Sequence, residues 1–341
     1  MRAAVFEGPG NVRVQDVPDA TIELPTDAVV RVTHSGICGS DLWAYRGYGS
    51  RVPGQRIGHE FVGVVDSVGS DVSTVKPGDV VVSPFVWSDG VCDYCRGGLQ
   101  TSCEDGGFWG EPGSDGAQGE AVRVPYADGT LVIVPKALHG AEEKVLPLAD
   151  VMSTGHHAAV AGGVHAGSRV AVIGDGAVGL CAVLAARRLG AGRVLILGHH
   201  SDRLKVAWEF GATDVVSGSG EEATEEVMAL TGGVDVVLEC VGAQGAFDTA
   251  FAIVRDGGTV GYVGVPHAVD GIDLGRMFGH NIGLRGGVAP ARAYIPTLLT
   301  DVVNGTLDAS PIFNLTVDLE DVSAGYQAMD SRQALKVLVQ P

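Results

Sequence analysis

A chain of 341 residues is long for a single hydrophobic core, so its length predicts two domains. The net charge of −18, with no cluster of Lys or Arg, disfavours nucleic acid and anionic membrane surfaces as partners. The longest apolar runs are only as long as a strand and no basic-then-apolar leader opens the chain, so we expect no membrane span, no secretory signal and a cytoplasmic protein.

Residues 1–151 have the composition of a mostly β domain. They are rich in β-branched residues and turn glycines, and they show little helical periodicity. The valine-rich segments 29–32 and 62–65 are typical of strands, and the Pro-Gly-Asp sequence at 77–79 separates two of them.

From residue 152 to residue 287, short apolar runs alternate with helical segments. Strands are predicted at 170–173, 194–197, 234–239, 259–263 and 282–285, and helices at 177–189, 202–210 and 246–254. This alternation predicts parallel βαβ units in a doubly wound sheet. After residue 288 we expect a helix at 293–303, a strand around Val317 and Leu319, and a last strand at 334–339 that returns to the first domain.

Residues 174–179 read Gly-Asp-Gly-Ala-Val-Gly, directly after a predicted strand and at the start of a predicted helix. The first glycine permits a tight turn, the second lets a pyrophosphate approach the backbone, and the third lets helix and strand pack closely. Free N–H groups at the helix N-terminus then favour the anion. In this context we expect a dinucleotide site rather than a plain glycine-rich turn, formed by Gly174, Gly176, Ala177, Val178 and Gly179.

The second predicted strand of this domain ends without a carboxylate. NAD-binding sites usually carry an acidic residue there, but Gly198 occupies the position, and Asp202 comes later, where we expect it to cap the next helix. Gly198 leaves room for a 2′-phosphate, and His199, His200 and Arg203 offer it positive partners. We therefore favour NADP(H) over NAD(H); the alternative is that the histidines are merely solvated and the protein accepts NAD.

The six cysteines are of two kinds. Without an export signal, closely spaced cysteines more often bind metal than form disulfides. Cys92, Cys95 and Cys103 have the spacing Cys-x₂-Cys-x₇-Cys, which seldom arises from packing alone. Cys181 and Cys240 lie in apolar segments, where we expect inert core residues.

Four motifs follow one another in a characteristic order: the segments 38–41 (Cys-Gly-Ser-Asp) and 58–60 (Gly-His-Glu), the cysteine group and the glycine motif. Together they resemble the zinc-dependent alcohol dehydrogenase family of the medium-chain dehydrogenase/reductase superfamily, over essentially the whole chain. The resemblance implies an α/β fold: a GroES-like, mostly β catalytic domain (1–151), a Rossmann cofactor domain (152–287) and a return to the catalytic domain (288–341). It also implies a small-molecule alcohol or carbonyl substrate, and a homotetramer or homodimer joined partly near 282–285.

By this resemblance a thiolate, an imidazole and a carboxylate hold a catalytic zinc that acts as a Lewis acid on the substrate oxygen. Glu60 matches a mobile carboxylate that approaches the zinc, Asp41 orients the imidazole, and Ser40 takes the proton of the alcohol. Trp43 stands where the family often continues this relay with a histidine. The zinc ligands implied are Cys38, His59 and Asp150, although Asp150 is also placed as a helix N-cap would be.

Further roles follow from the same resemblance. The family's structural zinc lobe has four cysteines, and here an aspartate takes the first position, so we expect a closed zinc site rather than a vestigial lobe at Asp89, Cys92, Cys95 and Cys103.

The substrate pocket is expected at Trp43, Phe85 and Trp109, with Trp87 in the core. The nicotinamide half of the cofactor is expected against Thr154, Val241, Gly264 and Val265. Lys336 either pairs with Glu60 or a phosphate, or is solvated.

Two other classes of protein are alternatives to a zinc-dependent dehydrogenase. A zinc-free quinone reductase would not need Cys38, His59 and the cysteine group together. A non-catalytic structural or regulatory protein of the same fold would have lost metal ligands, and these are present in the sequence. We therefore expect an enzyme that moves a hydride between an alcohol, or its aldehyde or ketone, and NADP(H) or NAD(H).

Overall fold

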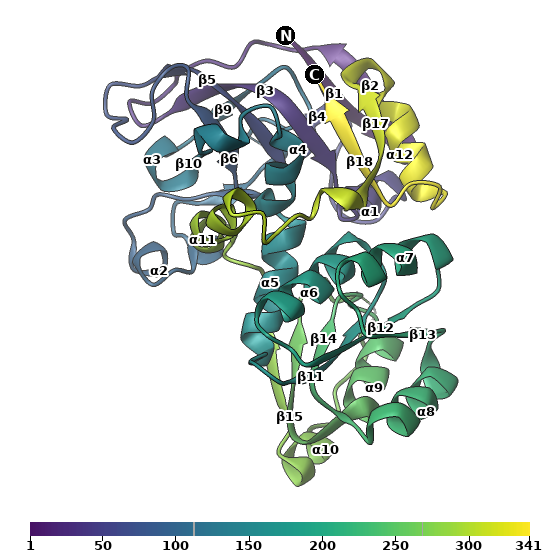
Figure 1. The fold of residues 1–341 in the computed structure, drawn as a ribbon. Helices are drawn as coiled ribbons and strands as arrows, with labels where there is room; N and C mark the ends of the chain where they lie inside the picture. Colours follow the sequence, from purple (N-terminus) through teal and green to yellow (C-terminus); the bar gives the residue numbers. More distant parts are fainter. Residues whose placement is uncertain (112, 268) are drawn as a thin grey trace. The chain divides into compact units, whose positions relative to one another are not determined.

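The computed structural model describes residues 1–111, 113–267 and 269–341, which fall into two units (Figure 1). The first unit contains Met1–Asp150 and Pro290–Pro341, and the second contains Val151–Ala289. The first is built mainly of strands and the second around one parallel sheet, so the expected α/β class is confirmed. No helix in the described ranges combines the length and the apolar character needed to cross a bilayer.

Two sheets organise the first unit. A small antiparallel sheet has the order β2-β1-β4, and a larger one runs β10-β6-β5-β3-β18-β17, with β9 also paired to β3. The bounds are β1 Arg2–Gly8, β2 Asn11–Asp16, β3 Ala28–Ile37, β4 Gln55–Arg56, β5 Phe61–Val68, β6 Val80–Ser83, β9 Ala121–Val124, β10 Val132–Ile133, β17 Phe313–Asp318 and β18 Lys336–Gln340. A separate hairpin pairs β7 Val86–Trp87 with β8 Gly107–Phe108.

The last strand, β18, lies between β3 and β17 in the larger sheet (Figure 1). It runs antiparallel to β3, with Val337 opposite Ile37 and Val339 opposite Ser35, and parallel to β17. The final strand thus lies in a sheet of the first unit, and it begins at Lys336 rather than at residue 334.

Short helices join the strands of the first unit. In its N-terminal segment they are α1 Asp41–Tyr45, α2 Asp93–Arg96, η1 Gln100–Ser102, α3 Ala127–Thr130, η2 Lys136–Leu138, α4 Glu142–Val145 and η3 Leu146–Ala149. In its C-terminal segment they are α11 Ala291–Val303, η4 Ser310–Ile312, η5 Leu319–Asp321 and α12 Val322–Asp330.

The second unit is a six-stranded parallel sheet with the order β13-β12-β11-β14-β15-β16. Its strands are β11 Arg169–Ile173, β12 Arg193–Gly198, β13 Asp214–Ser217, β14 Val234–Glu239, β15 Val254–Tyr262 and β16 Gly283–Gly286. Its helices are α5 Val151–Gly162, α6 Ala177–Arg188, α7 Ser201–Glu209, α8 Gly220–Thr231, α9 Gln244–Ile253 and α10 Leu274–His280. The strand order reverses between β11 and β14, and ligands of doubly wound sheets bind at such a switch point.

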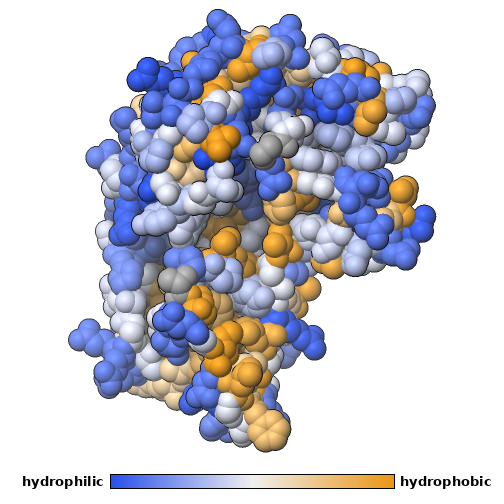
Figure 2. Space-filling view, turned by 180° about the vertical axis from the view of Figure 1, so that it is seen from behind, coloured by the Kyte–Doolittle hydropathy of each residue, from blue (hydrophilic) through white to orange (hydrophobic). Residues whose placement is uncertain are grey.

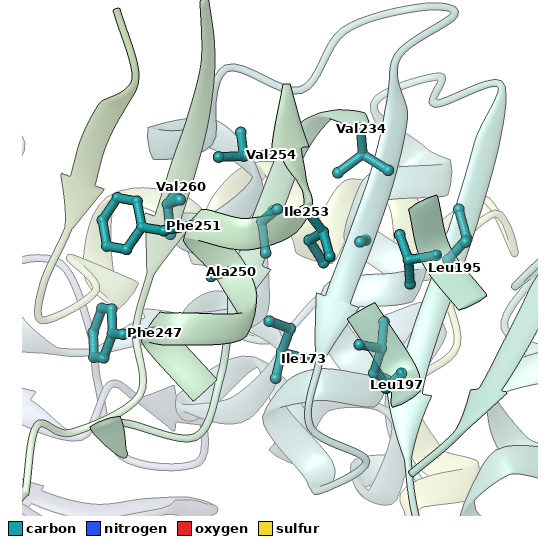
Figure 3. Close-up of a cluster of buried hydrophobic side chains, with 14 of the residues drawn as sticks. Ile173, Leu195, Leu197, Val234, Phe247, Ala250, Phe251, Ile253, Val254 and Val260 are labelled. Carbon is teal, nitrogen blue, oxygen red and sulfur yellow. The ribbon is translucent and has the colours of Figure 1, made fainter. Parts of the chain in front are cut away.

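The core of the second unit lies between the sheet and its helices (Figure 3). Ile173, Leu195 and Leu197 come from neighbouring strands, and Phe247 and Phe251 come from α9. All five are at most 7% exposed, and each buried side chain of this kind stabilises the fold by about 1.5–3 kcal/mol. The runs of apolar residues that predicted strands are therefore explained by burial on both faces of the sheet.

Two local predictions are wrong. Asp202 does not cap α7: His200 is the N-cap residue, and Asp202 lies in the first turn of the helix, paired with Lys205. Cys181 is buried as expected, but Cys240, at the end of β14, is only partly buried.

Candidate active site

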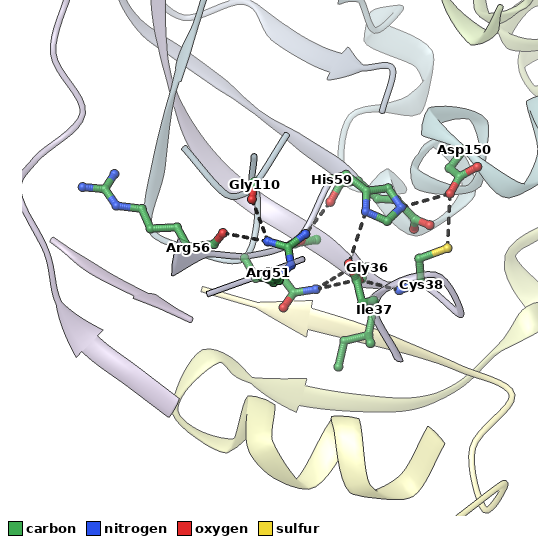
Figure 4. A network of polar contacts seen from close by, with 12 residues as sticks. Gly36, Ile37, Cys38, Arg51, Arg56, His59, Gly110 and Asp150 are labelled. Carbon is green, nitrogen blue, oxygen red and sulfur yellow. Dashed lines mark hydrogen bonds and ion pairs between the residues drawn. The ribbon is translucent and has the colours of Figure 1, made fainter. Parts of the chain in front are cut away.

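Four potential ligands meet in the first unit. Cys38 follows the end of β3, His59 and Glu60 precede β5, and Asp150 follows η3. The Sγ atom of Cys38 lies 3.3 Å from Oδ2 of Asp150, and Nε2 of His59 lies 3.1 Å from the same oxygen. One ligand atom from each of the four residues lies within 4.8 Å of all the others. Figure 4 shows Cys38 and His59 pointing toward Asp150.

The imidazole of His59 is held from its other side. Nδ1 of His59 lies 3.3 Å from Oδ1 of Asp41, and Oδ2 of Asp41 accepts a hydrogen bond from the backbone N–H of Cys38. The amide of Gln118 donates to Gly36 and approaches Asp41, and the hydroxyl of Tyr326 in α12 donates to Gln118. This network leaves Nε2 of His59 facing Asp150, as a metal-binding imidazole requires.

Glu60 forms a buried ion pair. The Nζ atom of Lys336 donates to Oε1 of Glu60 at 2.7 Å and to the carbonyl oxygen of Ile37 at 3.3 Å. The two charged side chains are 0% and 1% exposed, so the alternative of a solvated Lys336 is wrong. Oε2 of Glu60 has no hydrogen-bond partner among the described residues, which leaves one oxygen able to accept a further ligand.

The charges and pKa shifts of the residues in this cluster favour the binding of a cation. Burial raises the pKa of the Cys38 thiol, and the Asp150 carboxylate raises it further. Burial works against a charged His59, but Asp41 and Asp150 together raise its pKa well above the usual value. Thiolate, imidazole and carboxylate are ligands that zinc accepts, and the positive charge of the ion would stabilise the deprotonated sulfur. The donor set therefore fits zinc.

The other residues expected around this cluster lie in different environments. Ser40 is exposed, and its hydroxyl does not cap α1. Trp43 is partly buried and packs edge-on against Tyr48. Phe85 is 7% exposed and stacks on Phe108.

Trp109 lies in the core of the first unit. It is 2% exposed, packs against Phe61 and Trp87, and donates its indole N–H to the carbonyl oxygen of Pro84 at 2.9 Å. Trp87 packs against the same core, as the sequence predicts. Trp109 therefore contacts the residue that precedes Phe85 and supports that segment from within the core.

A second cluster surrounds α2. Ligand atoms of four residues lie within 4.8 Å of one another: Asp89, Cys92, Cys95 and Cys103. The Sγ atoms of Cys92 and Cys103 are 3.9 Å apart, far beyond the length of a disulfide, and all the cysteines are free. Oδ1 of Asp89 accepts from the backbone N–H groups of Val91 and Cys92, which hold the pKa of Asp89 down at about 2 against the effect of its partial burial.

Backbone N–H groups also face the sulfurs of this cluster. Those of Cys95 and Glu104 lower the pKa of the Cys92 thiol. Burial raises the pKa of Cys103, but the N–H of Asp89 donates to its sulfur at 3.2 Å and opposes that rise. N–H donors favour negative sulfur at Cys92 and Cys103, whereas burial raises the pKa of the Cys95 thiol. Three sulfurs and an ionised carboxylate are a donor set that fits a closed zinc site, where the ion itself would favour the thiolate form of Cys95.

The glycine motif of the second unit has the geometry that a dinucleotide loop requires. Gly174 follows β11 with φ +107°, which favours glycine. A side chain at Gly179 would overlap the carbonyl oxygen of Gly174, whereas one at Gly176 would meet no described atom within 4 Å. Gly176 is the N-cap of α6, so the loop leaves open space beside the free N–H groups of Ala177 and Val178.

The loops after β14 and β15 are held by a residue that the sequence patterns did not single out. Oε1 of Glu239 accepts from the backbone N–H groups of Val241 and Gly242, each at 2.7 Å. Its carbonyl oxygen accepts from the N–H of Gly264. Val241 and Val265 are 40% and 63% exposed, while Thr154 is partly buried in α5.

The tip of β12 contains an unexpected carboxylate. Gly198, His199 and His200 lie there as expected, but Asp175, the second residue of the glycine motif, lies against them. Its Oδ2 atom accepts from the backbone N–H groups of His199 at 2.7 Å and His200 at 2.8 Å. Arg203 in α7 approaches the same carboxylate at 3.8 Å.

Both units are similar to known protein families. Residues 24–136 match the alcohol dehydrogenase GroES-like domain, and residues 177–304 match the zinc-binding dehydrogenase family. The zinc-type alcohol dehydrogenase-like protein AdhB of Bacillus subtilis is 32% identical over 381 residues, an alignment that covers 100% of both chains.

Solved structures agree with these matches. The alcohol dehydrogenase TADH from Thermus sp. ATN1 is 37% identical, with a TM-score of 0.94 over 100% of this chain and 99% of that one. The zinc-dependent alcohol dehydrogenase 2 of Streptococcus pneumoniae, in its apo form, is 33% identical, with a TM-score of 0.92 over 100% of this chain and 98% of that one.

Proposed function

The chain belongs to the zinc-dependent alcohol dehydrogenase family of the medium-chain dehydrogenase/reductase superfamily, and we propose that it transfers a hydride between an alcohol, or the corresponding aldehyde or ketone, and NADP(H) or NAD(H). The observation that carries this proposal is the convergence of Cys38, His59 and Asp150, with their ligand atoms within 4.8 Å of one another.

These three residues would hold the catalytic zinc. When bound, the ion supplies Lewis-acid stabilisation of negative charge on the substrate oxygen. Asp41 fixes the ring of His59 and thereby directs Nε2 toward the cluster. Lys336 holds Glu60 through one carboxylate oxygen and leaves the other available to approach the cluster. In the second cluster, a structural zinc would be held by Asp89, Cys92, Cys95 and Cys103.

Ser40, two residues after the ligand Cys38, is the candidate proton acceptor. Its hydroxyl is exposed and is not used to cap α1, so it remains available to take the proton of an alcohol. Trp43, where a histidine would continue the relay, has no titratable group, so a proton held at Ser40 would have to leave by another route, through water or a ribose hydroxyl of a bound cofactor. Trp43 and Phe85 supply apolar surface for the substrate, and Trp109 supports Phe85 from the core.

The nicotinamide dinucleotide would bind along the carboxyl ends of the parallel strands. The pyrophosphate would lie at the N-terminus of α6, where Gly176 leaves space. The nicotinamide half would contact Thr154 in α5 and Val241, Gly264 and Val265 in loops that Glu239 orders. The choice between NADP(H) and NAD(H) depends on the tip of β12, where Asp175 lies.

A homodimer or homotetramer would form in part through the second unit. Its strand β16 is an edge strand, which offers unpaired backbone groups to a second copy. The adjacent helix α10 exposes Leu274 and Phe278 at 72% and 89%. Figure 2 shows hydrophobic side chains gathered on the lower part of the molecule in that view. None of the six cysteines forms a disulfide, which suits a reducing compartment and supports a cytoplasmic location.

Metal content and turnover of the purified protein test the proposal. Alcohols and carbonyls would be screened with NAD(H) and NADP(H) at 340 nm, and zinc would be counted by plasma mass spectrometry. We expect His59→Ala to lose about one zinc per chain and its turnover while keeping its fold by circular dichroism, because a ligand of the catalytic ion is gone. His165→Ala, in an exposed loop, is the matched control. Wild-type turnover in zinc-depleted His59→Ala protein would refute the zinc mechanism.

A further inference from the structure

Asp175 occupies the space beside Gly198 at the tip of β12. The carboxylate comes from the loop after β11, not from β12 itself, and the residue is 6% exposed. A Cβ atom added at Gly198 would lie 2.6 Å from Cβ of Asp175 and 2.7 Å from its Oδ2. Glycine is therefore required at 198 because the Asp175 side chain fills the position that a larger residue would take.

The groups expected to receive a 2′-phosphate are already engaged by this carboxylate. Asp175 accepts hydrogen bonds from the backbone N–H groups of His199 and His200, and Nδ1 of His200 lies 3.0 Å from it. Nη1 of Arg203 lies 3.8 Å away. Burial opposes a charged Asp175, but these N–H groups and the His200 ring lower the pKa of the carboxyl, so it is ionised at neutral pH.

We propose that Asp175 selects NAD(H) over NADP(H), with a carboxylate delivered from the glycine motif in place of one at the end of β12. This inference rests on the proposed function and names a determinant of cofactor choice. A 2′-phosphate at the tip of β12 would meet the negative charge of Asp175, and it would compete with that charge for Arg203 and for the N–H groups of His199 and His200. A 2′-hydroxyl brings no such repulsion. The preference for NADP(H) based on Gly198 is thereby reversed.

Dissociation constants for the two reduced cofactors test this inference without turnover. Nicotinamide fluorescence would be titrated with the zinc-loaded wild type and with Asp175→Asn, whose amide oxygen still accepts from the backbone N–H groups. We expect the wild type to bind NADH at least tenfold more tightly than NADPH, and Asp175→Asn to shift the ratio at least tenfold toward NADPH. Asp202→Asn removes the same charge from an exposed residue of α7 and should leave the ratio unchanged.

A second probe uses the wild type alone. We expect 5′-AMP to raise the melting temperature more than adenosine 2′,5′-bisphosphate does, because only the latter carries a 2′-phosphate. Two results would overturn the role of Asp175: tighter binding of NADPH than of NADH by the wild type, or an unchanged ratio of the two dissociation constants in a folded Asp175→Asn variant. Either result would leave the dehydrogenase proposal intact. If neither NADH nor NADPH binds, the proposed function itself fails.

Discussion

Replacing Lys336 with methionine would leave the carboxylate of Glu60 buried without its counter-charge. Lys336 and Glu60 are 1% and 0% exposed, and their charged atoms are 2.7 Å apart. Methionine keeps most of the volume of lysine, so the loss of charge dominates over any cavity. Removing one partner of a buried pair destabilises a protein by about 3–5 kcal/mol. The carboxyl can respond by taking up a proton, and because burial raises the pKa of Glu60 this costs less than the ~3–4 kcal/mol that an ordinary glutamate needs at pH 7, so the loss should lie near the lower end of that range.

The assay is urea and thermal unfolding of the zinc-loaded protein at pH 7, with zinc content measured for each variant. A loss of this size lowers the melting temperature of the first unit by on the order of 10 °C. Lys205→Met is the matched control, because Lys205 pairs with Asp202 at the same 2.7 Å but both side chains are exposed. Water screens that pair, so its removal should leave the unfolding midpoint unchanged.

A double-mutant cycle isolates the interaction between the two charges. Glu60→Gln combined with Lys336→Met removes both, and it should be more stable than Lys336→Met alone. The reasoning is refuted if Lys336→Met unfolds at the same midpoint as Lys205→Met, or if the double variant recovers nothing while zinc content is unchanged.

Two further substitutions probe the cysteine lobe and the parallel sheet. Cys95→Ser should release about one zinc per chain and lower the melting temperature, because a structural zinc contributes folding energy; unchanged metal content and melting temperature would instead indicate a lobe of free thiols. Asp235→Asn removes a carboxylate that accepts from Arg169 and Arg255, whose guanidinium groups lower the pKa of Asp235 against the effect of its partial burial. Because the pKa of Asp235 is lower in the folded protein than in the unfolded chain, its ionised carboxylate stabilises the fold at pH values above the ordinary aspartate pKa of about 4. This stabilisation is lost as the pH falls through the pKa that Asp235 has in the folded protein. Urea midpoints should therefore differ most between wild type and Asp235→Asn near neutral pH and converge in acid; a difference that does not vary with pH would contradict this.

The sequence predicts the parallel sheet best where a strand is a continuous run of branched apolar residues. The segment 234–239 is predicted with the bounds that β14 has. The strand β13 has only two apolar residues at its centre, and α8 includes four glutamates, so neither has a periodic pattern strong enough to be recognised. Pairing with β12 determines β13, and packing of Ala223 and Val227 in the core determines α8; a local sequence pattern contains neither kind of contact.

The candidate site shows the same limit. The spacing of Cys92, Cys95 and Cys103 identifies their cluster because all three lie in one short segment. The Asp175 carboxylate accepts hydrogen bonds from residues 24 and 25 positions further along the chain. The glycine motif allows any residue at position 175, so the pattern does not predict this role. Trp109 matches a pocket position in the sequence, but its contacts with Phe61 and Trp87 place it in the core.

The position of β18 has a consequence for the order in which the protein is made. Lys336 donates to the carbonyl oxygen of Ile37, a residue 299 positions earlier, and the whole second unit is synthesised between them. On the ribosome the parallel-sheet unit is complete while the first unit still lacks β17 and β18. Domains fold as they emerge, so the second unit can fold before β18 exists, and the end of β3 at residues 35–37, which pairs with β18, is left unpaired until then. Until β18 is translated, the carboxylate of Glu60 has no Lys336 to pair with. Chains that stop before β18 therefore retain an open edge and an unpaired charge, two features of the aggregation-prone intermediates that chaperones bind.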